Sequence, residues 1–434
     1  MIKFGFAKIK YSKKMKLKLL FLLLAVQVSV AQHRTCGMQQ QLQAIMNDPI
    51  KRQVYLDQQS KFDTELQKIQ SNAFRSTNIV IKIPVAVHFP AVATTSTLKA
   101  CFKALAQSQI NVLNADYDGT NADIANWPSV SANYPNTNTG NLQVQFVLAT
   151  QNHPAGSGIA EGTPAVTFGT DFLGTNDTDT TWSGYLNLVC RNAGSGILGY
   201  SPLGGSPTAG NCVVISKASF GSGSGCTGYI PTSPYNLGRT LTHELGHYFN
   251  LDHPFVSCDG ANCNTSGDRV CDTPSCDQPR YDCNSADNPP TPGGGNPPLT
   301  SCGFLQLTMN FMDYVEDSCM YMFTAGQATR MQAWYNSITG QFKTNVLANE
   351  QFLQNQFSMY PNPTKGSFTI AFKDNLSSYS VEVFDVTGKT IYENNFDQSS
   401  NLVQIINLDN ATSGVYFVNI KSDKGLVTKK LVIQ

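Results

Sequence analysis

The sequence has few charged residues and, after its first 31 positions, no long apolar run. Asp, Glu, Lys and Arg make up 14% of the 434 residues against 41% hydrophobic residues, which is typical of a compact chain rather than a disordered one. Basic and acidic residues number 30 each, and seven of the basic ones fall in positions 1–31. The remainder is therefore mildly acidic, which gives no electrostatic case for nucleic-acid binding.

The first 31 residues have the three parts of a secretory signal peptide. A Lys-rich stretch ends at Lys18, an apolar run extends over 19–26, and small residues precede a cleavage site expected after Ala31. The alternative is a membrane anchor, but this run, interrupted by Gln27, is shorter than the ~20 residues that span a bilayer. No other segment is apolar enough, so we expect an exported protein without a transmembrane anchor.

Twelve Cys in an exported chain indicate disulfides, because oxidising compartments preserve them. The Cys-rich region lacks paired CxxC spacing, which argues against the alternative of a zinc cluster. Its Gly-, Pro- and Asn-rich sequence has little means of packing itself, so we expect bridges to hold it. The Cys of this region are Cys258, Cys263, Cys271, Cys276, Cys283, Cys302 and Cys319.

Changes in sequence pattern divide the chain into five predicted parts. A signal peptide at 1–31 precedes a Gln-rich pro-segment at 32–75, whose apolar residues have helical spacing. A catalytic domain is predicted at 76–345 and a polar linker at 346–356. Short alternating strands then predict a separate small β-sandwich at 357–434.

The catalytic part alternates between strand and helix patterns in its first half. Strands are predicted at 79–89, 142–148 and 184–190, and a helix at 97–113. This alternation predicts an α/β layer with a twisted sheet.

The second half of the catalytic part contains more loop. A helix begins near Leu237 and breaks at 250–254, and an irregular stretch over 255–303 is followed by a helix at 325–347. A loop of that length inside a compact domain is usually functional or tied down. We therefore expect an irregular, disulfide-rich lower part.

Three of the six His lie within eleven residues, in His243-Glu-Leu-Gly-His247-Tyr-Phe-Asn-Leu-Asp-His253. Residues four apart lie on one helix face, about 6 Å apart along the axis, so His243 and His247 reach one metal ion. Glu244 lies beside them, near enough to hydrogen-bond a metal-bound water. HExxH alone is a weak signal, since two ordinary His on a helix produce it, but a third His completes the three-imidazole set of catalytic zinc.

The position of His253 predicts where this helix ends. Six residues beyond His247, it would lie on the wrong side of an unbroken helix. Asn250 lies midway, and Asn tolerates the left-handed conformation that ends a helix and reverses the chain. Pro254 cannot continue a helix.

Three motifs, in chain order, resemble those of the pappalysin family in the metzincin clan. Residues 236–247 with His253 are similar to the active-site helix, Gly267-Asp-Arg-Val-Cys-Asp-Thr-Pro274 to a loop motif, and Asn310-Phe-Met-Asp-Tyr314 to the Met-turn. The resemblance spans about 76–345. It implies a metzincin-type α/β fold and a zinc metalloendopeptidase with protein or peptide substrates.

The resemblance also implies roles for residues around the metal. Glu244 is the general base, and Met312 lies beneath the zinc. Tyr314 donates a hydrogen bond to the tetrahedral oxyanion, although its spacing suits core packing equally. The chain departs from the family at Asn250, where the family has Gly, and in the loop 284–300, which looks longer than usual.

Cys36 lies at the start of the pro-segment, apart from every other Cys. A thiolate on the open zinc position would keep a precursor latent, and the resemblance supports such a cysteine switch. The alternative is a disulfide, which the even number of Cys favours.

Acidic residues in two loops are further candidates. The resemblance implies calcium near Asp268 and Asp272, although no EF-hand spacing exists and a solvated loop Asp is the alternative. Glu316 and Asp317 follow the Met-turn, where the wall of the pocket beyond the scissile bond is expected. An acid there, Asp317 above all, favours Arg or Lys in the substrate, and two exposed loop acids without that role are the alternative. His88, in an apolar strand, is expected to be a core histidine.

The C-terminal strands carry a second resemblance. Residues 359–366, 383–389, 413–417 and the terminal Lys-Lys-Leu-Val-Ile-Gln434 resemble the sorting domain of the bacterial type IX secretion system. This implies the type IX machinery as a partner and a product that passes through the periplasm to be secreted or attached to the cell surface. Carbohydrate binding is the alternative, but no exposed aromatic row stands out.

These features together predict a latent precursor of a secreted zinc metalloendopeptidase. The rivals are a zinc hydrolase that acts on other bonds and a non-catalytic adhesin on the same fold. Glu244 argues against the adhesin, because an inactive relative has no need for a carboxylate beside an open metal position.

Overall fold

The computed structural model describes most of the chain between Arg34 and Gln434. The predicted signal peptide, most of the predicted linker and nearly all of the loop at 284–300 lie outside the described residues. Among the described helices, none combines the length and the apolar character that a bilayer span requires. The described residues are 34–71, 81–169, 171–172, 177–194, 196–281, 283, 300–347, 357–372, 378–397, 402–408, 411–422 and 425–434.

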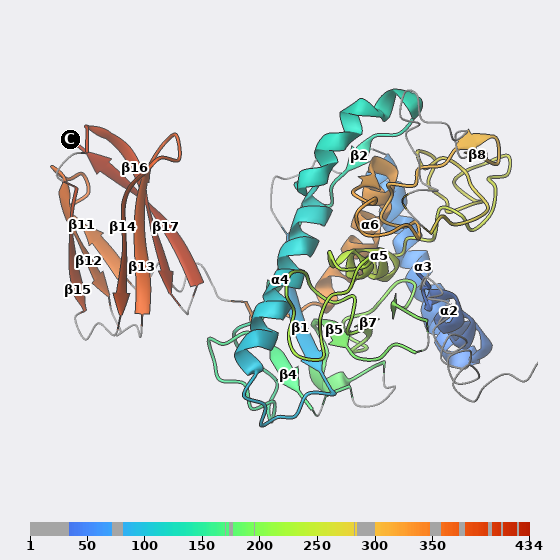
Figure 1. Ribbon diagram of the computed structural model, residues 1–434, viewed down its shortest axis with the longest axis horizontal. Helices are drawn as coiled ribbons and strands as arrows, with labels where there is room; N and C mark the ends of the chain where they lie inside the picture. Colours follow the sequence, from blue (N-terminus) through green and yellow to red (C-terminus); the bar gives the residue numbers. More distant parts are fainter. Residues whose placement is uncertain are drawn as a thin grey trace, which may run out of the picture. The chain divides into compact units, whose positions relative to one another are not determined.

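A six-stranded, mostly parallel sheet carries the first half of the catalytic part (Figure 1). Strand β1 pairs in parallel with β3, β4 and β5, and β5 pairs in parallel with β7. Strand β6 is antiparallel to β7 and ends the order β3-β1-β5-β7-β6. The strands are β1 (Ile81–Phe89), β3 (Val144–Leu148), β4 (Val166–Phe168), β5 (Leu186–Cys190), β6 (Gly199–Tyr200) and β7 (Cys212–Ile215).

Two helices cover one face of this sheet. Helix α4 (Lys99–Asp118) packs against β3 and helix α5 (Arg239–Tyr248) against β7 and β6, and their apolar side chains join alternate residues of β1 in the main core. On the other face of β1, Ala86 and His88 contact a second cluster that includes Trp182 and Tyr185. Both faces are therefore covered, as a parallel sheet requires, and the predicted α/β layer is confirmed.

The second half of the catalytic part has little regular structure. Helix α6 (Ala325–Ile338) begins with a capping box between Thr324 and Gln327 and continues only into a short 3-10 turn, η4 (Thr339–Gln341). The remaining short elements are β2 (Thr139–Gly140), β8 (Thr300–Ser301), β9 (Phe304–Leu305), β10 (Phe323–Thr324), η1 (Ala122–Ser129), η2 (Ser131–Asn133) and η3 (Thr180–Trp182).

Two predicted boundaries differ from the structure here. The helix predicted at 325–347 ends about nine residues early, because Phe342 adopts an extended conformation after the 3-10 turn. Val346, placed in the linker by its polar surroundings, is fully buried, and its carbonyl accepts hydrogen bonds from the amides of Thr150 and Gln151. The packed unit therefore extends into the predicted linker.

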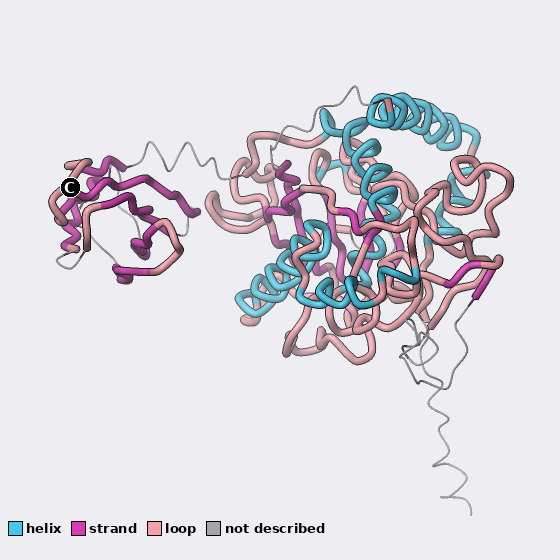
Figure 2. Tube along the Cα trace, turned by 90° about the horizontal axis from the view of Figure 1, so that it is seen from above, coloured by secondary structure: helices cyan, strands magenta, loops and turns pink. Residues whose placement is uncertain are grey.

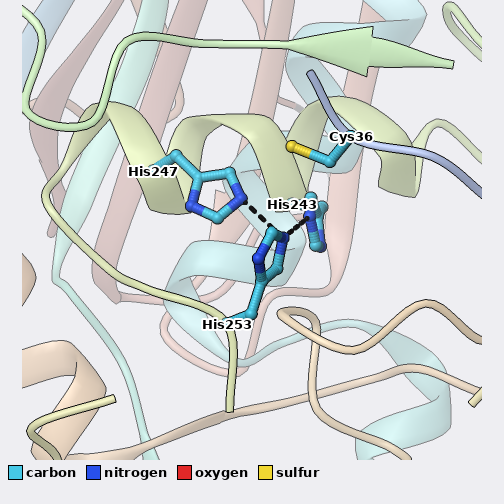
Figure 3. A group of neighbouring side chains, drawn as sticks. All are labelled: Cys36, His243, His247 and His253. Atoms are coloured by element: carbon cyan, nitrogen blue, oxygen red, sulfur yellow. Dashed lines mark hydrogen bonds between the residues drawn. The ribbon is translucent and has the colours of Figure 1, made fainter. Parts of the chain in front are cut away.

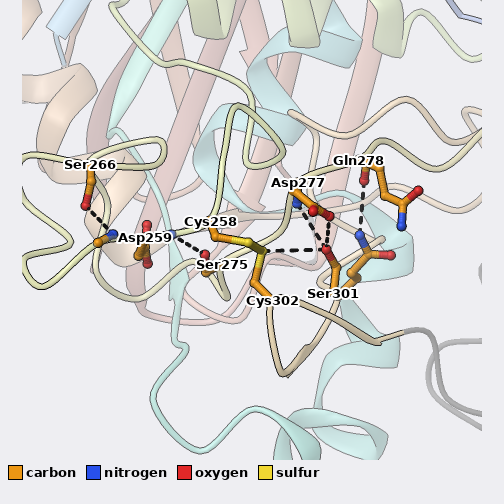
Figure 4. Close-up of a disulfide and its surroundings, with 10 residues drawn as sticks. Cys258, Asp259, Ser266, Ser275, Asp277, Gln278, Ser301 and Cys302 are labelled. Carbon is orange, nitrogen blue, oxygen red and sulfur yellow. Dashed lines mark hydrogen bonds between the residues drawn. A yellow bond between two sulfur atoms is a disulfide. The ribbon is translucent and has the colours of Figure 1, made fainter.

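Four disulfides form, and three of them hold the irregular stretch together as predicted. They are Cys101–Cys226, Cys258–Cys302, Cys263–Cys271 and Cys283–Cys319. Cys258 and Cys302 lie beside Asp277, but their sulfurs are bonded to each other and offer no thiolate to a metal (Figure 4). The zinc-cluster alternative is therefore excluded for these three residues.

Four Cys stay unbridged, and one of them, Cys276, belongs to the stretch that bridges were expected to hold. Cys190 and Cys212 are buried in β5 and β7, where a thiol packs as a small apolar group, and Cys276 is also buried. The fourth is Cys36, so the disulfide alternative for this residue is excluded.

The predicted pro-segment is helical, as its spacing indicated. Helix α2 (Met38–Asn47) and helix α3 (Pro49–Gln70) meet at Asp48, whose side chain accepts hydrogen bonds from the amides of Ile50 and Lys51. Pro49 occupies the first position of α3, where its missing amide hydrogen costs nothing.

The C-terminal strands form two antiparallel sheets, in the orders β11-β12-β15 and β14-β13-β16-β17. They enclose one apolar core, which confirms the predicted sandwich (Figure 2). In strand β14 the polar residues Glu393, Asn394 and Asn395 interrupt the apolar alternation. The strands are β11 (Phe357–Tyr360), β12 (Ser367–Phe372), β13 (Ser378–Asp385), β14 (Thr390–Asp397), β15 (Val403–Asn407), β16 (Gly414–Ser422) and β17 (Gly425–Ile433).

Candidate active site

Hydrogen bonds to helix α4 fix the orientation of helix α5 about its own axis. The hydroxyl of Thr242 donates to Asp116 at 2.7 Å, and its carbonyl accepts from the hydroxyl of Tyr117 at 3.1 Å. All ten residues of α5 are buried, so His243, Glu244 and His247 point into packed surroundings rather than solvent.

Asn250 reverses the chain after α5. Its φ of 69° lies in the left-handed region, and its amide donates to the carbonyl of His247 at 2.8 Å. The amide of Leu251 then donates to the carbonyl of Gly246 at 2.9 Å. This turn carries His253 back toward the two His of the helix (Figure 3).

The three imidazoles converge on one point. Nε2 of His253 lies 3.2 Å from Nε2 of His243 and 3.0 Å from Nε2 of His247. These contacts are not simple hydrogen bonds, because Nδ1–H of His243 donates to the carbonyl of Phe311 at 2.8 Å and Nδ1–H of His247 to that of Leu251 at 2.7 Å. In both neutral rings Nε2 is thus an acceptor, and His253 has one proton at most to share between them.

A cation bound between the three Nε2 atoms would remove the repulsion between their lone pairs. Metal–nitrogen distances of ~2.0–2.1 Å in a tetrahedral site place ligand nitrogens ~3.3 Å apart, close to the separations found here. Burial holds the pKa of His243 and His253 well below the ordinary value and lowers that of His247 to about 4. The rings are therefore neutral, as metal ligands must be. These residues fit a bound metal ion.

Glu244 lies between the imidazoles and strand β6. It is 1% exposed, and burial raises its pKa to about 8, a value that a nearby cation would lower. Gly199 of β6 leaves room for it, since a Cβ there would lie 2.9 Å from Cγ of Glu244 and from the carbonyl oxygen of Val214. The thiol of Cys36 donates to Oε2 of Glu244 at 3.2 Å.

Cys36 reaches the imidazoles along strand β6. The amide of Gly37 donates to the carbonyl of Gly199 at 3.1 Å, and the amide of Leu198 to the carbonyl of Thr35 at 3.2 Å, so this segment lies parallel to the edge strand. The sulfur and the nearest imidazole nitrogens all lie within 4.8 Å of one another. Burial, followed by the charge of Glu244, raises the pKa of the thiol well above its ordinary value.

The predicted Met-turn lies under the helix. Met312 is fully buried, and a Cβ at Gly246 would lie 2.3 Å from its Sδ, so the thioether occupies the space that this glycine leaves. The amide of Met312 donates to Asn310, whose side-chain amide pairs reciprocally with that of Gln327 in α6. The turn is therefore fixed from two sides.

Tyr314 packs edge-on to His253 and at a tilt to His243. Its ring centroid lies 5.6 Å from that of His243 and 5.0 Å from that of His253. Burial raises the pKa of the phenol above its ordinary value, so the hydroxyl keeps its proton and can donate it in a hydrogen bond.

Asp317 is buried and paired with a residue of the predicted pro-segment. Its Oδ1 lies 2.6 Å from Nη2 of Arg34, and its Oδ2 accepts from the amides of Leu237 at 2.8 Å and Arg239 at 3.3 Å. The alternative of an exposed loop acid is therefore wrong for Asp317. Arg34 went unrecognised in the sequence, and its place two residues before Cys36 was the only available signal.

The two acids of the 268–272 loop behave differently. Asp268 is 3% exposed, burial raises its pKa to about 7, and among the described residues its Oδ2 has no hydrogen-bond partner. Asp272 instead accepts from Thr324 and from the amide of Gly326 at the start of α6, so it caps that helix. His88 is fully buried between Thr167 and Asn187, as expected of a core histidine.

Two separate segments of the chain match models of known protein families. Residues 227–336 match the family model of pregnancy-associated plasma protein-A, and residues 358–434 match that of the secretion system C-terminal sorting domain. An extracellular metalloprotease of Colletotrichum graminicola is 39% identical over 138 residues, which cover 29% of this chain and 44% of that protein. A second one from the same fungus is 27% identical over 74% of this chain and 96% of its own length.

Two solved structures are also similar. Tannerella forsythia mature mirolysin, in complex with a cleaved peptide, is 30% identical and is matched over its whole length by 62% of this chain, with a TM-score of 0.44. A mutant of Tannerella forsythia promirolysin is 28% identical over 71% of this chain and 95% of its own, with a TM-score of 0.49. By its sequence matches, the chain belongs to the pregnancy-associated plasma protein-A (pappalysin) family of metalloproteases and ends in a secretion system C-terminal sorting domain.

Proposed function

We propose that this chain is the latent precursor of a secreted zinc metalloendopeptidase that cleaves peptide bonds in proteins. The convergence of three neutral imidazoles beside Glu244 carries the proposal. Residues 32–75 form the pro-segment, the part from 76 to about 347 is catalytic, and 357–434 direct export through the periplasm by the type IX machinery. This architecture agrees with the extracellular metalloproteases and the sorting domain that the chain resembles.

Zinc is the metal that this ligand set favours. Three imidazole nitrogens with one open position are typical of catalytic zinc, whereas calcium and magnesium take oxygen ligands. The carbonyls of Phe311 and Leu251 fix the ring tautomers and so orient the donors toward the metal.

Each residue around the metal has its own role in the proposed reaction. Zinc, when bound, supplies Lewis-acid polarisation and lowers the pKa of the attacking water. Glu244 removes a proton from that water and passes it to the leaving amine. Tyr314 donates a hydrogen bond to the oxyanion, and the main chain of Gly199 on β6 holds the main chain of the substrate.

Latency follows from the position of Cys36. Its thiol occupies the space beside Glu244 and the imidazoles where water must enter, and burial excludes solvent. As a thiolate it would complete the tetrahedral zinc site, because the metal favours the charged form that burial alone disfavours.

Substrate preference follows from Asp317. In the precursor Arg34 holds its carboxylate in a buried ion pair, close along the chain to the residue that reaches the metal. Removal of the pro-segment frees Oδ1 while Oδ2 stays fixed by the amides of Leu237 and Arg239. A substrate Arg or Lys would take the place of Arg34.

Calcium is proposed at Asp268. A buried carboxylate with one unpartnered oxygen carries a desolvation cost that a hard cation relieves.

Glu244→Ala in the mature enzyme should retain one zinc per chain and lose peptide cleavage by ~10²–10⁴-fold, because only the base is removed. Tyr314→Phe should lower kcat by ~10²-fold with little change in KM. Elemental analysis and peptide hydrolysis measure both, with exposed Glu161→Ala as the control. Loss of zinc from Glu244→Ala would instead move Glu244 into the ligand set.

Cys36→Ala should make the uncut precursor active, because water then reaches the metal. Cleavage of a quenched-fluorescent peptide by the precursor measures this. Cys190→Ala, a buried free Cys in β5, is the matched control and should leave the precursor inert. A silent Cys36→Ala precursor with normal zinc content would mean that the pro-segment acts by steric cover alone.

Asp317→Asn should lower kcat/KM for peptides with Arg or Lys after the scissile bond by ~10²–10³-fold relative to peptides with Leu there, since a buried ion pair loses one partner. The ratio between substrates removes any general loss of folding from the comparison. An unchanged ratio would exclude Asp317 from the specificity pocket.

Asp268→Asn should abolish stabilisation by calcium. Saturation at ~100 times Kd contributes ~2.7 kcal/mol, which raises the Tm of the wild-type protein by a few degrees. Thermal melts with calcium and with a chelator measure this, and exposed Asp118→Asn should behave as wild type. A Tm of the wild-type protein that does not respond to calcium would remove the site.

A further inference from the structure

Helix α3 contacts the catalytic part at a place separate from the metal site. Its inward face carries residues spaced three and four apart, and the most buried of them, Phe62, is 2% exposed and belongs to the main core. The ring of Phe62 lies 5.9 Å from that of Trp334 in α6. Figure 1 shows α3 and α6 near each other, and the two helices are in contact. The residues of this face are Tyr55, Gln58, Gln59, Phe62, Leu66 and Ile69.

Polar side chains fix the register of α3 on this surface. Gln59 and Asn250 exchange two hydrogen bonds between their side-chain amides, at 3.1 and 3.0 Å. Gln58 donates to the hydroxyl of Ser337 at 3.0 Å. Asn250 is fully buried, so its amide depends on Gln59 for these bonds.

Arg330 of α6 is covered by the same helix. It is 5% exposed, and its guanidinium lies 4.9 Å over the ring of Phe62. Among the described residues its Nε and Nη2 have no hydrogen-bond partner, so the aromatic face of Phe62 stabilises this cation together with the charges of Asp252 and Asp268.

The pro-segment therefore holds the catalytic part at two places. One comprises Arg34 and Cys36 at the metal site, and the other is the inward face of α3. Both lie within residues 34–71, on the same side of the stretch 72–80 that leads to β1. A cut in 72–80 removes none of the described contacts of either place.

We propose that Asn250, Arg330, Trp334 and Ser337 form a docking surface that keeps residues 34–71 bound after the chain is cut between α3 and β1, as a non-covalent inhibitor. The inhibition rests on the latency proposed for Cys36. Two contacts joined on one segment bind ~10²–10⁴-fold more tightly than either alone, provided both engage at once. Activation then requires a second cut between them, and the junction of α2 and α3 at Asp48 is partly exposed.

The test uses the full chain with a recognition sequence for a site-specific protease placed within 72–80. After the cut, size-exclusion chromatography and mass spectrometry report whether residues 34–71 stay with the remainder, and peptide hydrolysis reports latency. We expect the segment to be retained and the enzyme to stay inert. Immediate dissociation of the wild-type segment would overturn the proposal.

Single substitutions separate docking from the metal contact. Phe62→Ala should speed dissociation of the cut segment ~100-fold or more, and Gln59→Ala should speed it ~10-fold. Val54→Ala and Gln53→Ala, on the exposed face of α3, are the matched controls and should leave it unchanged. Equal rates in all four variants would overturn the docking surface, and Gln59→Ala keeps the test valid if Phe62→Ala fails to fold.

A second cut and one further variant complete the design. A second recognition sequence at Asp48 should release both pieces and restore activity. Cys36→Ala, cut only within 72–80, should still retain the segment through α3, although the enzyme is active. Retention of the wild-type segment with full activity would overturn the inhibitory role proposed for Cys36 and leave the docking surface standing, so the two failures are distinguishable.

Discussion

The arrangement of the catalytic part depends on three imidazole nitrogens that share one point. Two acceptor nitrogens lie 3.0–3.2 Å from Nε2 of His253, where their lone pairs repel unless a cation lies between them, so the fold must hold the rings together before a metal arrives. The turn at Asn250 and the Met-turn supply the constraint, because their carbonyls, those of Leu251 and Phe311, fix the two helix-borne rings. Gly246 lets the Met-turn approach the helix closely enough to do so.

The same geometry explains how one segment can block the site. The edge strand β6 has main-chain groups free to pair with an extended chain, and the segment around Cys36 takes them in the precursor. Arg34 and Cys36, two residues apart, then reach Asp317 and the three imidazoles respectively. In the function proposed above, the pro-segment thus fills the positions of substrate main chain, substrate side chain and attacking water with its own residues.

The main helices and strands and the cluster of three His were predictable from local sequence pattern, whereas the long-range contacts were not. Helical spacing and a helix-ending Asn250 predict that three His converge, because these residues lie within eleven positions of the chain, and buried strands such as β1 and β5 appear as apolar runs. The pairing of Arg34 with Asp317 joins residues 283 apart, which no local pattern specifies. The same holds for the thiols of Cys190 and Cys212, since their packing within the sheet depends on tertiary contacts rather than on spacing.

Asn250 belongs both to a turn that local sequence predicts and to a tertiary contact that it does not. Glycine would adopt the left-handed turn with less strain, as the family pattern has it, so the amide at this position has to be stabilised by something other than the turn. Within the described chain, the side chain of Asn250 forms hydrogen bonds only with Gln59 of the pro-segment helix. The turn that brings His253 to the other two imidazoles is thereby also part of the surface that α3 covers. In the proposed precursor, docking of α3 and the position of His253 are therefore coupled through Asn250, so a chain that binds α3 correctly has its third proposed ligand in place.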